Sequence, residues 1–352
     1  MSAQMNPHAY VCIMAGGSGE RFWPMSRPST PKHLLKLFSD RTLIEETVRR
    51  IEGVVPPQNI FVLTNQVQLA AMRAALPFMK PEQIIAEPAK RDTAPAAALA
   101  TGYVRARDPD GVLALLPADA LIKDSETFAR QLQQALEVAA QGESLLTFAI
   151  TPTHPATGFG YLEMAETRDD GLRRVARFVE KPDLPTAEKY LAGGNHGWNA
   201  GIFLWNVSSF LAEAEKNAPE LVKFIRDFPT GDCTAYLAER FPTLPKISVD
   251  YAIMEKATSV ATMVAEFDWD DVGSWTALPT HLPQDGQGNT TKGNVIAHES
   301  SNNIAISSGR VIALCGVKDL VVVETADSIM VCHRDAVQDI KKLMADLPPE
   351  VK

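Results

Sequence analysis

A glycine-rich loop followed by cations is the segment of the sequence with the clearest chemistry. The stretch "VCIMAGGSGERFWPMSRPSTPKHLLKL" begins as a buried apolar run and then changes character. The residues that could act on a ligand are Gly16, Gly17, Gly19, Arg21 and Lys32. Glycines can take positive φ and bring backbone N–H groups close to an anion, and the cations would neutralise charge on transferred and leaving phosphates. The loop therefore predicts a triphosphate cradle, with a tight packing turn as the alternative.

Three common glycine motifs do not fit this loop. A P-loop needs Gly-Lys-Ser/Thr, and the dinucleotide fingerprint needs a third glycine three residues after its second, whereas Glu20, Arg21 and Phe22 follow Gly19. A nucleophile elbow is also excluded, because Ser18 has glycines immediately beside it.

Two carboxylates are placed where a metal ion for triphosphate chemistry could bind. Asp119 in "LLPADA" follows the apolar run 112–116, and Asp271 lies in "FDWDDVGSW" at a second transition from strand to turn. Mg²⁺ is usually held by one or two carboxylates together with substrate phosphates. Asp119 and Asp271 are the predicted ligands, with Asp270 as a rival to Asp271. Helix capping is the alternative role for an aspartate after a strand.

Three short motifs further along the chain suit the recognition of a sugar phosphate. They are "TGFGYLEM" (157–164), "RFVEKP" (177–182) and "WNAGIFLW" (198–205), and their candidate contact residues are Gly160, Glu180, Lys181 and Asn199. Glutamate and asparagine direct hydrogen bonds to hydroxyls, lysine offers a charge for the phosphate, and glycine leaves space. As alternatives, Glu-Lys-Pro could be an exposed turn, and Trp198 and Trp205 could be core residues.

These residues need a framework, and apolar runs alternate with helical patterns through most of the chain. The expected strands are 10–15, 60–64, 112–117 and 144–150, and the expected helices are 43–51, 67–76, 94–107 and 128–140. This alternation predicts an α/β fold with a mostly parallel sheet covered on both faces. Ligands of such sheets bind beyond the carboxyl ends of the strands.

The pattern changes in the polar stretch "LPTHLPQDGQGNTTKGN", which predicts domains at 1–285 and 286–352. Nearly regular β-rich runs follow at 295–297, 304–306, 311–314, 320–324 and 329–333, and then a helix at 336–347. The spacing indicates a small stacked β coil. Because so few rungs bury little surface, the coil should pack on the first domain or on another subunit, and we expect a homodimer through it.

Composition limits the possible partners. The chain has 352 residues, is 45% hydrophobic and carries a net charge of -9 with scattered cations, which argues against nucleic-acid binding. We expect no membrane association and a cytoplasmic location, because neither a signal pattern nor an apolar run of about 20 residues is found. Cys12, Cys233, Cys315 and Cys332 lack metal-site spacing and are expected to be free thiols in the core.

Over nearly its whole length the sequence resembles the mannose-1-phosphate guanylyltransferases. The matching pieces are "AGGSGERFWPMSRPSTPKHLL", "EPAKRDTAPAAALA", "LLPADA", "FVEKP", "WNAGIFLW", "SVDYAIMEK" and "WDDVGSW". The resemblance implies a Rossmann-like nucleotidyltransferase domain, a short left-handed β-helix-like domain and dependence on Mg²⁺. It also implies site roles. These are triphosphate contacts at Arg21 and Lys32, metal ligands at Asp119 and Asp271, sugar-phosphate contacts at Glu180, Lys181 and Asn199, and a guanine site near Glu87, Asp92 and Thr93.

The expected reaction is transfer of GMP from GTP to α-D-mannose 1-phosphate, which gives GDP-mannose and pyrophosphate by direct in-line attack. Two features depart from the family. Lys90 stands where many relatives have Asn, and a cupin-like isomerase domain is not expected, nor is isomerase activity. Asp92 or Thr93 could instead cap the helix near Ala94. Other substrates of the same chemistry, or a non-catalytic sensor of GDP-mannose, are the alternative functions.

Overall fold

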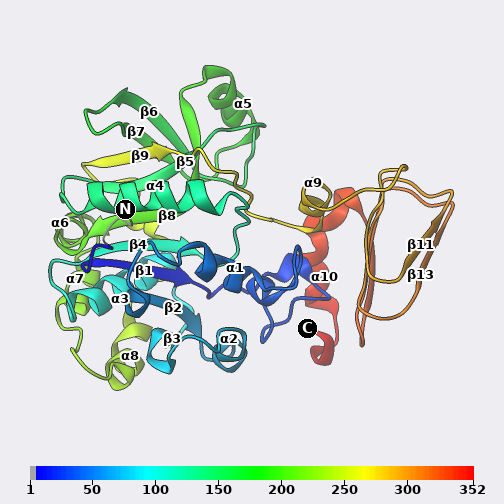
Figure 1. Cartoon of the computed structure of the whole chain (residues 1–352), viewed down its shortest axis with the longest axis horizontal. Coiled ribbons are helices and arrows are strands. Elements are labelled where there is room, and N and C mark those ends of the chain that lie inside the picture. The colour runs from blue at the N-terminus through cyan, green and yellow to red at the C-terminus, as the bar shows by residue number, and fades with distance from the viewer. Residues whose placement is uncertain (1–4) are drawn as a thin grey trace.

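The computed structural model of the protein describes residues 5–352, in which a large sheet dominates the first part of the chain (Figure 1). The sheet has nine strands in the order β3-β2-β1-β4-β8-β5-β9-β7-β6. Their bounds are β1 Ala9–Met14, β2 Ile60–Asn65, β3 Ile84–Glu87, β4 Val112–Pro117, β5 Leu145–Ile150, β6 Tyr161–Thr167, β7 Arg173–Val179, β8 His196–Asn206 and β9 Val260–Val264.

The central strands are buried on both faces, as their continuous apolar runs require. β1 pairs in parallel with β2 and β4, β2 with β3, and β5 with β9, whereas β7 and β8 run against their neighbours. The predicted mostly parallel sheet is thus confirmed. The first residues of β8 also pair with β6, so the part of the sheet beyond β8 curls back on itself.

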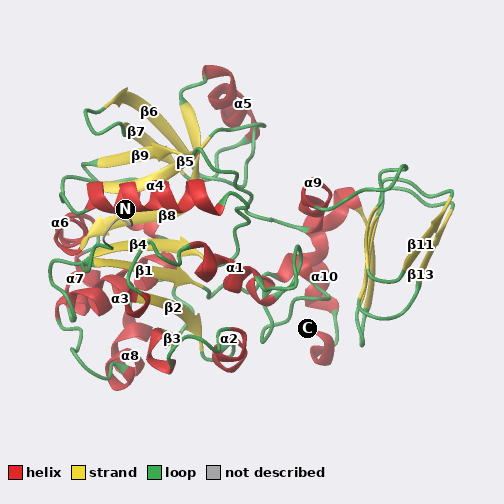
Figure 2. Ribbon diagram, in the orientation of Figure 1, coloured by secondary structure: helices red, strands yellow, loops and turns green. Residues whose placement is uncertain are grey.

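Helices cover both faces of the sheet, as predicted (Figure 2). One face carries α1 Leu43–Arg50, α2 Leu69–Ala75, α4 Ser125–Ala139 and α5 Leu184–Gly193. The other carries α3 Thr93–Arg105, α6 Val207–Asn217, α7 Pro219–Arg226 and α8 Thr234–Arg240. The loops that leave β1, β3 and β4 at their carboxyl ends contain the glycine loop, Asp92 and Asp119, which places these residues along one edge of the sheet.

The C-terminal part is a β coil. β10 Thr290–Lys292, β12 Ile304–Ser307 and β14 Leu320–Glu324 stack in parallel as one wall, and β11 Val295–His298 pairs in parallel with β13 Ile312–Cys315 as another. β15 Ile329–His333 departs from the expected stacking because it runs antiparallel to β14. β10 lies inside the stretch predicted as a polar linker, and the expected helix 336–347 is a 3₁₀ turn, Arg334–Asp339, followed by α10 Ile340–Asp346.

The coil packs on the first domain through a shared hydrophobic core, as expected for so small a unit. The core joins the segment after the glycine loop to the short helix α9 Leu278–His281 and to the inner wall of the coil. Its fully buried members include Phe22, Val272, Trp275, Ile304 and Val321. In Figure 1, α10 in red stands between the blue segment that follows the glycine loop and the coil.

The cysteines are free, as predicted, but not all lie in the core. Cys12 is buried, Cys233 and Cys332 are partly buried, and Cys315 is exposed. The core prediction is wrong for Cys315, because alternate side chains of β13 point outward and its position falls on the outer face. Within residues 5–352, no helix is long and apolar enough to cross a membrane.

Two isoleucines of the coil give a matched test of the shared core. Ile304 is fully buried in the core that the coil shares with the first domain, whereas Ile296 is 65% exposed on β11. We expect Ile304→Ala to lower the free energy of unfolding by about 3 kcal/mol, through lost burial and a cavity. Ile296→Ala should change it by less than about 0.5 kcal/mol. Urea denaturation measures both, and equal effects would contradict the burial pattern.

Candidate active site

The glycine loop turns sharply at Gly19, which has a φ of 62°. A Cβ at this position would lie 2.5 Å from the Cβ of Lys32, so only glycine lets the two backbone segments approach this closely. Gly16 and Gly17 do not adopt positive φ. The sequence predicted that all three glycines could adopt positive φ, but of the three only Gly19 does so. Gly16 and Gly17 contribute backbone that no side chain covers.

Lys32 is the centre of the site. Its side chain is almost fully buried, and its Nζ lies 2.8 Å from Asp119 Oδ2. The same ammonium donates to the backbone oxygens of Asp271 at 2.6 Å and Val272 at 3.2 Å. Val272 has a φ of 48°, an unusual conformation for a β-branched residue, and the strained turn directs these carbonyls toward Lys32.

The two predicted metal carboxylates both lie near this ammonium, but their pKa values shift in opposite directions. Burial raises the pKa of Asp119, yet the charge and hydrogen bond of Lys32 outweigh burial, and the net shift is downward. For Asp271 burial is again the largest influence, and although Lys32 opposes it, the neighbouring Asp270 and Asp119 add to it, so that its pKa is raised. A second cation near both carboxylates would relieve this repulsion.

The hydrogen bonds of the aspartates bear on two alternatives stated for them. Both carboxylate oxygens of Asp270 are engaged, one with the backbone N–H of Val272 at 2.6 Å and one with Nε2 of His281 at 2.7 Å. Asp271 instead lines the recess beside Lys32. The cap of α4 is Asp124, which accepts from the N–H of Thr127 at 3.0 Å, so Asp119 is not a capping residue.

Lys32, Asp119 and Asp271 line a recess of about 400 Å³ beside the glycine loop. Its walls are Gly19, Glu20, Arg21, Phe22, Lys32, Asp119, Asp271, Gly273 and Lys341. The recess therefore joins Arg21, Lys32, Asp119 and Asp271 as predicted. Lys341 was not anticipated, because it belongs to α10 at the opposite end of the sequence and no local motif marks it.

A second pocket, of about 330 Å³, opens on the other side of the glycine loop. It brings together all five remaining nucleotide residues predicted from the sequence, which are Gly16, Gly17, Glu87, Asp92 and Thr93. Burial raises the pKa of Glu87 to about 8. Lys90 and Lys246 also line the pocket, and Lys246 was not predicted.

Asp92 and Thr93 both have structural partners at the start of α3, so the capping alternative is correct for Asp92. Its Oδ1 accepts from the N–H of Thr93 at 2.8 Å, and Asp92 itself has a φ of 74°. Thr93 Oγ1 accepts from the N–H of Val249 at 2.9 Å. Since both residues also line the pocket, capping and ligand contact are compatible here.

The predicted sugar residues gather where β6, β7 and β8 meet. The ammonium of Lys181 pairs with the carboxylate of Glu180, and the N–H of Asn199 donates to the oxygen of Gly160 at 2.8 Å. A Cβ on Gly160 would lie 2.5 Å from Glu180 Oε2, so glycine is required for this carboxylate to fit. All four residues thus belong to one cluster.

Asp250 joins this cluster and was missed from the sequence. Its Oδ1 accepts from Nδ2 of Asn199 at 3.2 Å. Burial raises its pKa to about 6, and the charge of Glu180 adds to the shift. Asp250 begins a π-helical turn, Asp250–Met254, a feature frequent at functional sites. Because Val249 contacts Thr93, the sugar cluster adjoins the pocket beside α3.

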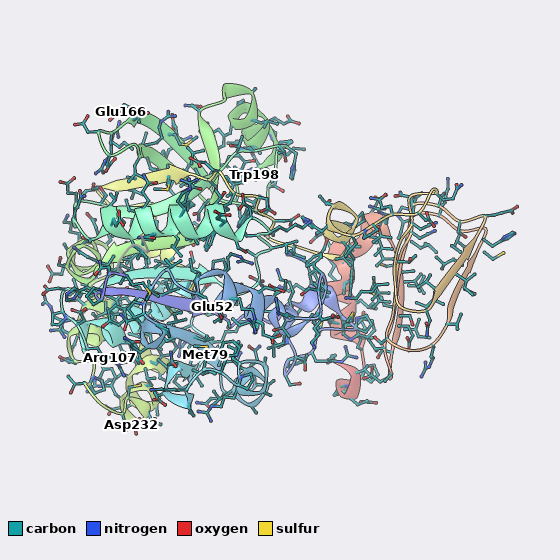
Figure 3. The ribbon with its side chains drawn as sticks, in the orientation of Figure 1. Glu52, Met79, Arg107, Glu166, Trp198 and Asp232 are labelled. Atoms are coloured by element: carbon teal, nitrogen blue, oxygen red, sulfur yellow. The ribbon has the colours of Figure 1, made fainter. Side chains whose placement is uncertain are left out.

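The two tryptophans of "WNAGIFLW" are core residues, in agreement with the alternative stated for them. Trp205 is fully buried, and its Nε1 donates to Thr101 Oγ1 at 3.0 Å. Trp198, labelled in Figure 3, is 5% exposed and packs against the rings of His154 and Phe159. Their role is to fix the strand that carries Asn199.

The fold and the recess define a nucleotidyl transferase, and comparison with known proteins agrees. The model of the "Nucleotidyl transferase" family matches residues 10–287. That of the "MannoseP isomerase/GMP-like beta-helix domain" matches residues 293–347.

Individual relatives narrow the class further. The mannose-1-phosphate guanylyltransferase of Escherichia coli K12 is 36% identical over 350 residues, covering 96% of this chain and 73% of that protein. The alginate biosynthesis protein AlgA of Pseudomonas aeruginosa is 37% identical over 350 residues, covering 95% and 71%. A crystal structure from Thermus thermophilus, described as a "mannose-1-phosphate geranyltransferase", superposes with a TM-score of 0.88 at 32% identity, covering 96% of this chain and 99% of that one. The chain belongs to the mannose-1-phosphate guanylyltransferase family.

The buried carboxyl of Glu87 predicts a pH dependence of stability. Since its pKa rises from an ordinary 4.5 to about 8, the folded protein binds the proton more tightly, and stability falls as the pH rises through this interval. We expect Glu87→Gln to flatten the fall in the free energy of unfolding between pH 4.5 and 8. Denaturation across this range measures it, with exposed Glu82→Gln as the control. An unchanged slope in Glu87→Gln would contradict the prediction.

Proposed function

We propose that the protein transfers GMP from GTP to α-D-mannose 1-phosphate, giving GDP-mannose and pyrophosphate. The observation that carries this proposal is the pair of pockets on either side of the glycine loop. One is lined by cations and carboxylates that include Arg21, Lys32, Asp119 and Asp271, as a triphosphate and its metal require. The other lies beside Glu87 and the start of α3. The family assignment supports the choice of substrates.

The chemistry proposed is one in-line displacement with no covalent enzyme intermediate. An oxygen of the sugar phosphate attacks the α-phosphorus of GTP while pyrophosphate leaves. The attacking phosphate is already an anion at neutral pH, so no general base is needed. The protein's contribution is to hold the two substrates in line, which can supply about 7–11 kcal/mol of the barrier, and to neutralise charge with Arg21 and Lys32.

The donor set of the recess fits Mg²⁺. Asp119 and Asp271 offer hard oxygen ligands beside the ammonium of Lys32, and such ions are commonly held by one or two carboxylates plus substrate phosphates. Within residues 5–352, no group of three or more His, Cys, Asp or Glu side chains is placed to hold a metal ion. When bound, the ion would neutralise charge on the triphosphate.

We assign recognition of guanine to the pocket beside α3, and recognition of the sugar phosphate to the cluster where β6, β7 and β8 meet. Guanine presents an N1–H and an amino group as donors and O6 as an acceptor. Glu87, Asp92 and Thr93 are the proposed acceptors. The cations that line the pocket, Lys90, Arg91 and Lys246, could donate to O6. Glu180, Lys181 and Asn199, with Gly160 leaving space, are proposed for the sugar phosphate, and Asp250 belongs with them because it contacts Asn199.

Dimerisation through the C-terminal domain and a cytoplasmic location stay predictions. The outer faces of the coil carry exposed apolar side chains that a second copy could cover, namely Ile296, Val311, Ile329 and Val331. The molecular mass of the particle in solution, by light scattering, measures the oligomeric state.

Pyrophosphate release by the purified protein tests the function. GTP, ATP, UTP and dTTP are each offered with mannose 1-phosphate and with glucose 1-phosphate in the presence of Mg²⁺. We expect rapid release with GTP and mannose 1-phosphate, and slow release with the other pairs. A different preferred pair would change the substrate assignment, and no release from folded protein that binds GDP-mannose would replace the enzyme with a sensor.

The roles of Asp119 and Arg21 are tested in the same assay. Asp119→Asn and Arg21→Ala should each lower kcat about 100-fold at saturating substrates, because each removes charge stabilisation from the reacting triphosphate. Asp110→Asn is the matched control, since Asp110 is exposed and outside both pockets. Circular dichroism confirms folding, and near-normal kcat in the first two variants would refute the assignment.

A further inference from the structure

The triphosphate recess contains a cation that the catalytic domain does not supply. Lys341 of α10 lines it together with Arg21 and Lys32. α10 follows the β coil in sequence, so this cation enters the recess from the second domain. The recess is therefore incomplete without the C-terminal part of the chain.

The position of Lys341 is fixed by the packing around it. The neighbouring Ile340 is 2% exposed and belongs to the core that contains Phe22. Trp23, which follows Phe22, donates from Nε1 to the backbone oxygen of Val351 at 2.7 Å. These contacts hold α10 and the turn after it against the segment that follows the glycine loop. The base of the Lys341 side chain is therefore fixed by packing, while the side chain itself is mostly exposed.

The ammonium of Lys341 has bonding capacity left for a ligand. Its side chain is 69% exposed, and its ion pair with Glu20 spans 3.9 Å, which is longer than a hydrogen bond. Lys32, by contrast, already contacts Asp119 and two backbone carbonyls. An ammonium has three donors, so Lys341 can donate to phosphate oxygens without breaking a strong contact.

We propose that Lys341 binds the β- and γ-phosphates of the nucleotide and then the pyrophosphate that they form. This rests on the proposed function. In the displacement a sugar-phosphate oxygen bonds to the α-phosphorus, and the bridging oxygen departs with the electron pair as part of pyrophosphate. Lys341 neutralises charge on that leaving group, and the C-terminal domain thereby contributes directly to the active site.

The experiment compares two adjacent lysines of α10 in the full chain. Lys341→Met removes the cation from the recess and keeps the length of the side chain. Lys342→Met is the matched control, because Lys342 pairs with Asp339 at 2.6 Å and does not line the recess. Calorimetric titration with inorganic pyrophosphate and Mg²⁺ gives the Kd, and initial rates give KM for each substrate. Lys341→Arg tests whether charge alone restores binding.

We expect Lys341→Met to raise the Kd of pyrophosphate and the KM of GTP about fivefold, the scale of an exposed ion pair, with KM for mannose 1-phosphate unchanged. Lys341→Arg should recover most of the affinity, and Lys342→Met should match the wild type. Equal values for both methionine variants, or no pyrophosphate binding by the wild type, would overturn the proposal. Failure of the proposed function is distinguishable, because it would abolish turnover while the pyrophosphate titration still reported on Lys341.

Discussion

The buried ammonium of Lys32 is the contact on which the rest of the site depends. A charge taken out of water must be compensated by nearby groups, and Lys32 finds them on two other segments, at Asp119 after β4 and at the carbonyls of Asp271 and Val272. These segments are far apart in the sequence and meet at this point. Enclosing the ammonium also constrains neighbouring residues. Gly19 must lack a side chain, and Val272 must adopt a strained backbone conformation.

The two pockets beside the glycine loop differ in electrostatics although each contains carboxyl groups. In the recess the pKa of Asp119 is lowered, because Lys32 outweighs burial. In the pocket beside α3, burial raises the pKa of Glu87. Asp119 thus acts as the charged partner of a buried ammonium on one side of the loop, whereas burial favours the neutral form of Glu87 on the other. This contrast suits a nucleotide that carries its negative charge at one end and hydrogen-bonding base edges at the other.

The sequence predicted the local motifs and part of the framework, because both depend on short-range patterns, but it did not predict β3 or β6 to β9. Continuous apolar runs located β1, β2, β4 and β5, and glycines and acids at strand ends located the loop and Asp119. Residues that join the site through tertiary packing were missed. Lys246 and Lys341 belong to no quoted motif, and Asp250 lies in "SVDYAIMEK", whose residues do not reveal its contact with Asn199. The reversal of β15 against β14 follows from coil packing rather than from the spacing of apolar runs.

The shared core has a consequence for how the protein comes to be assembled during synthesis. Phe22 and Trp23 are made early, but the side chains that enclose them, such as Trp275, Ile304 and Ile340, follow more than 250 residues later. The central sheet can form while translation continues, whereas the segment between the glycine loop and α1 must wait with its aromatic side chains uncovered. The nascent enzyme therefore holds an ordered sheet with an unfinished phosphate site until α10 has been made. Chaperones that shield apolar surface would have their clearest substrate in that interval.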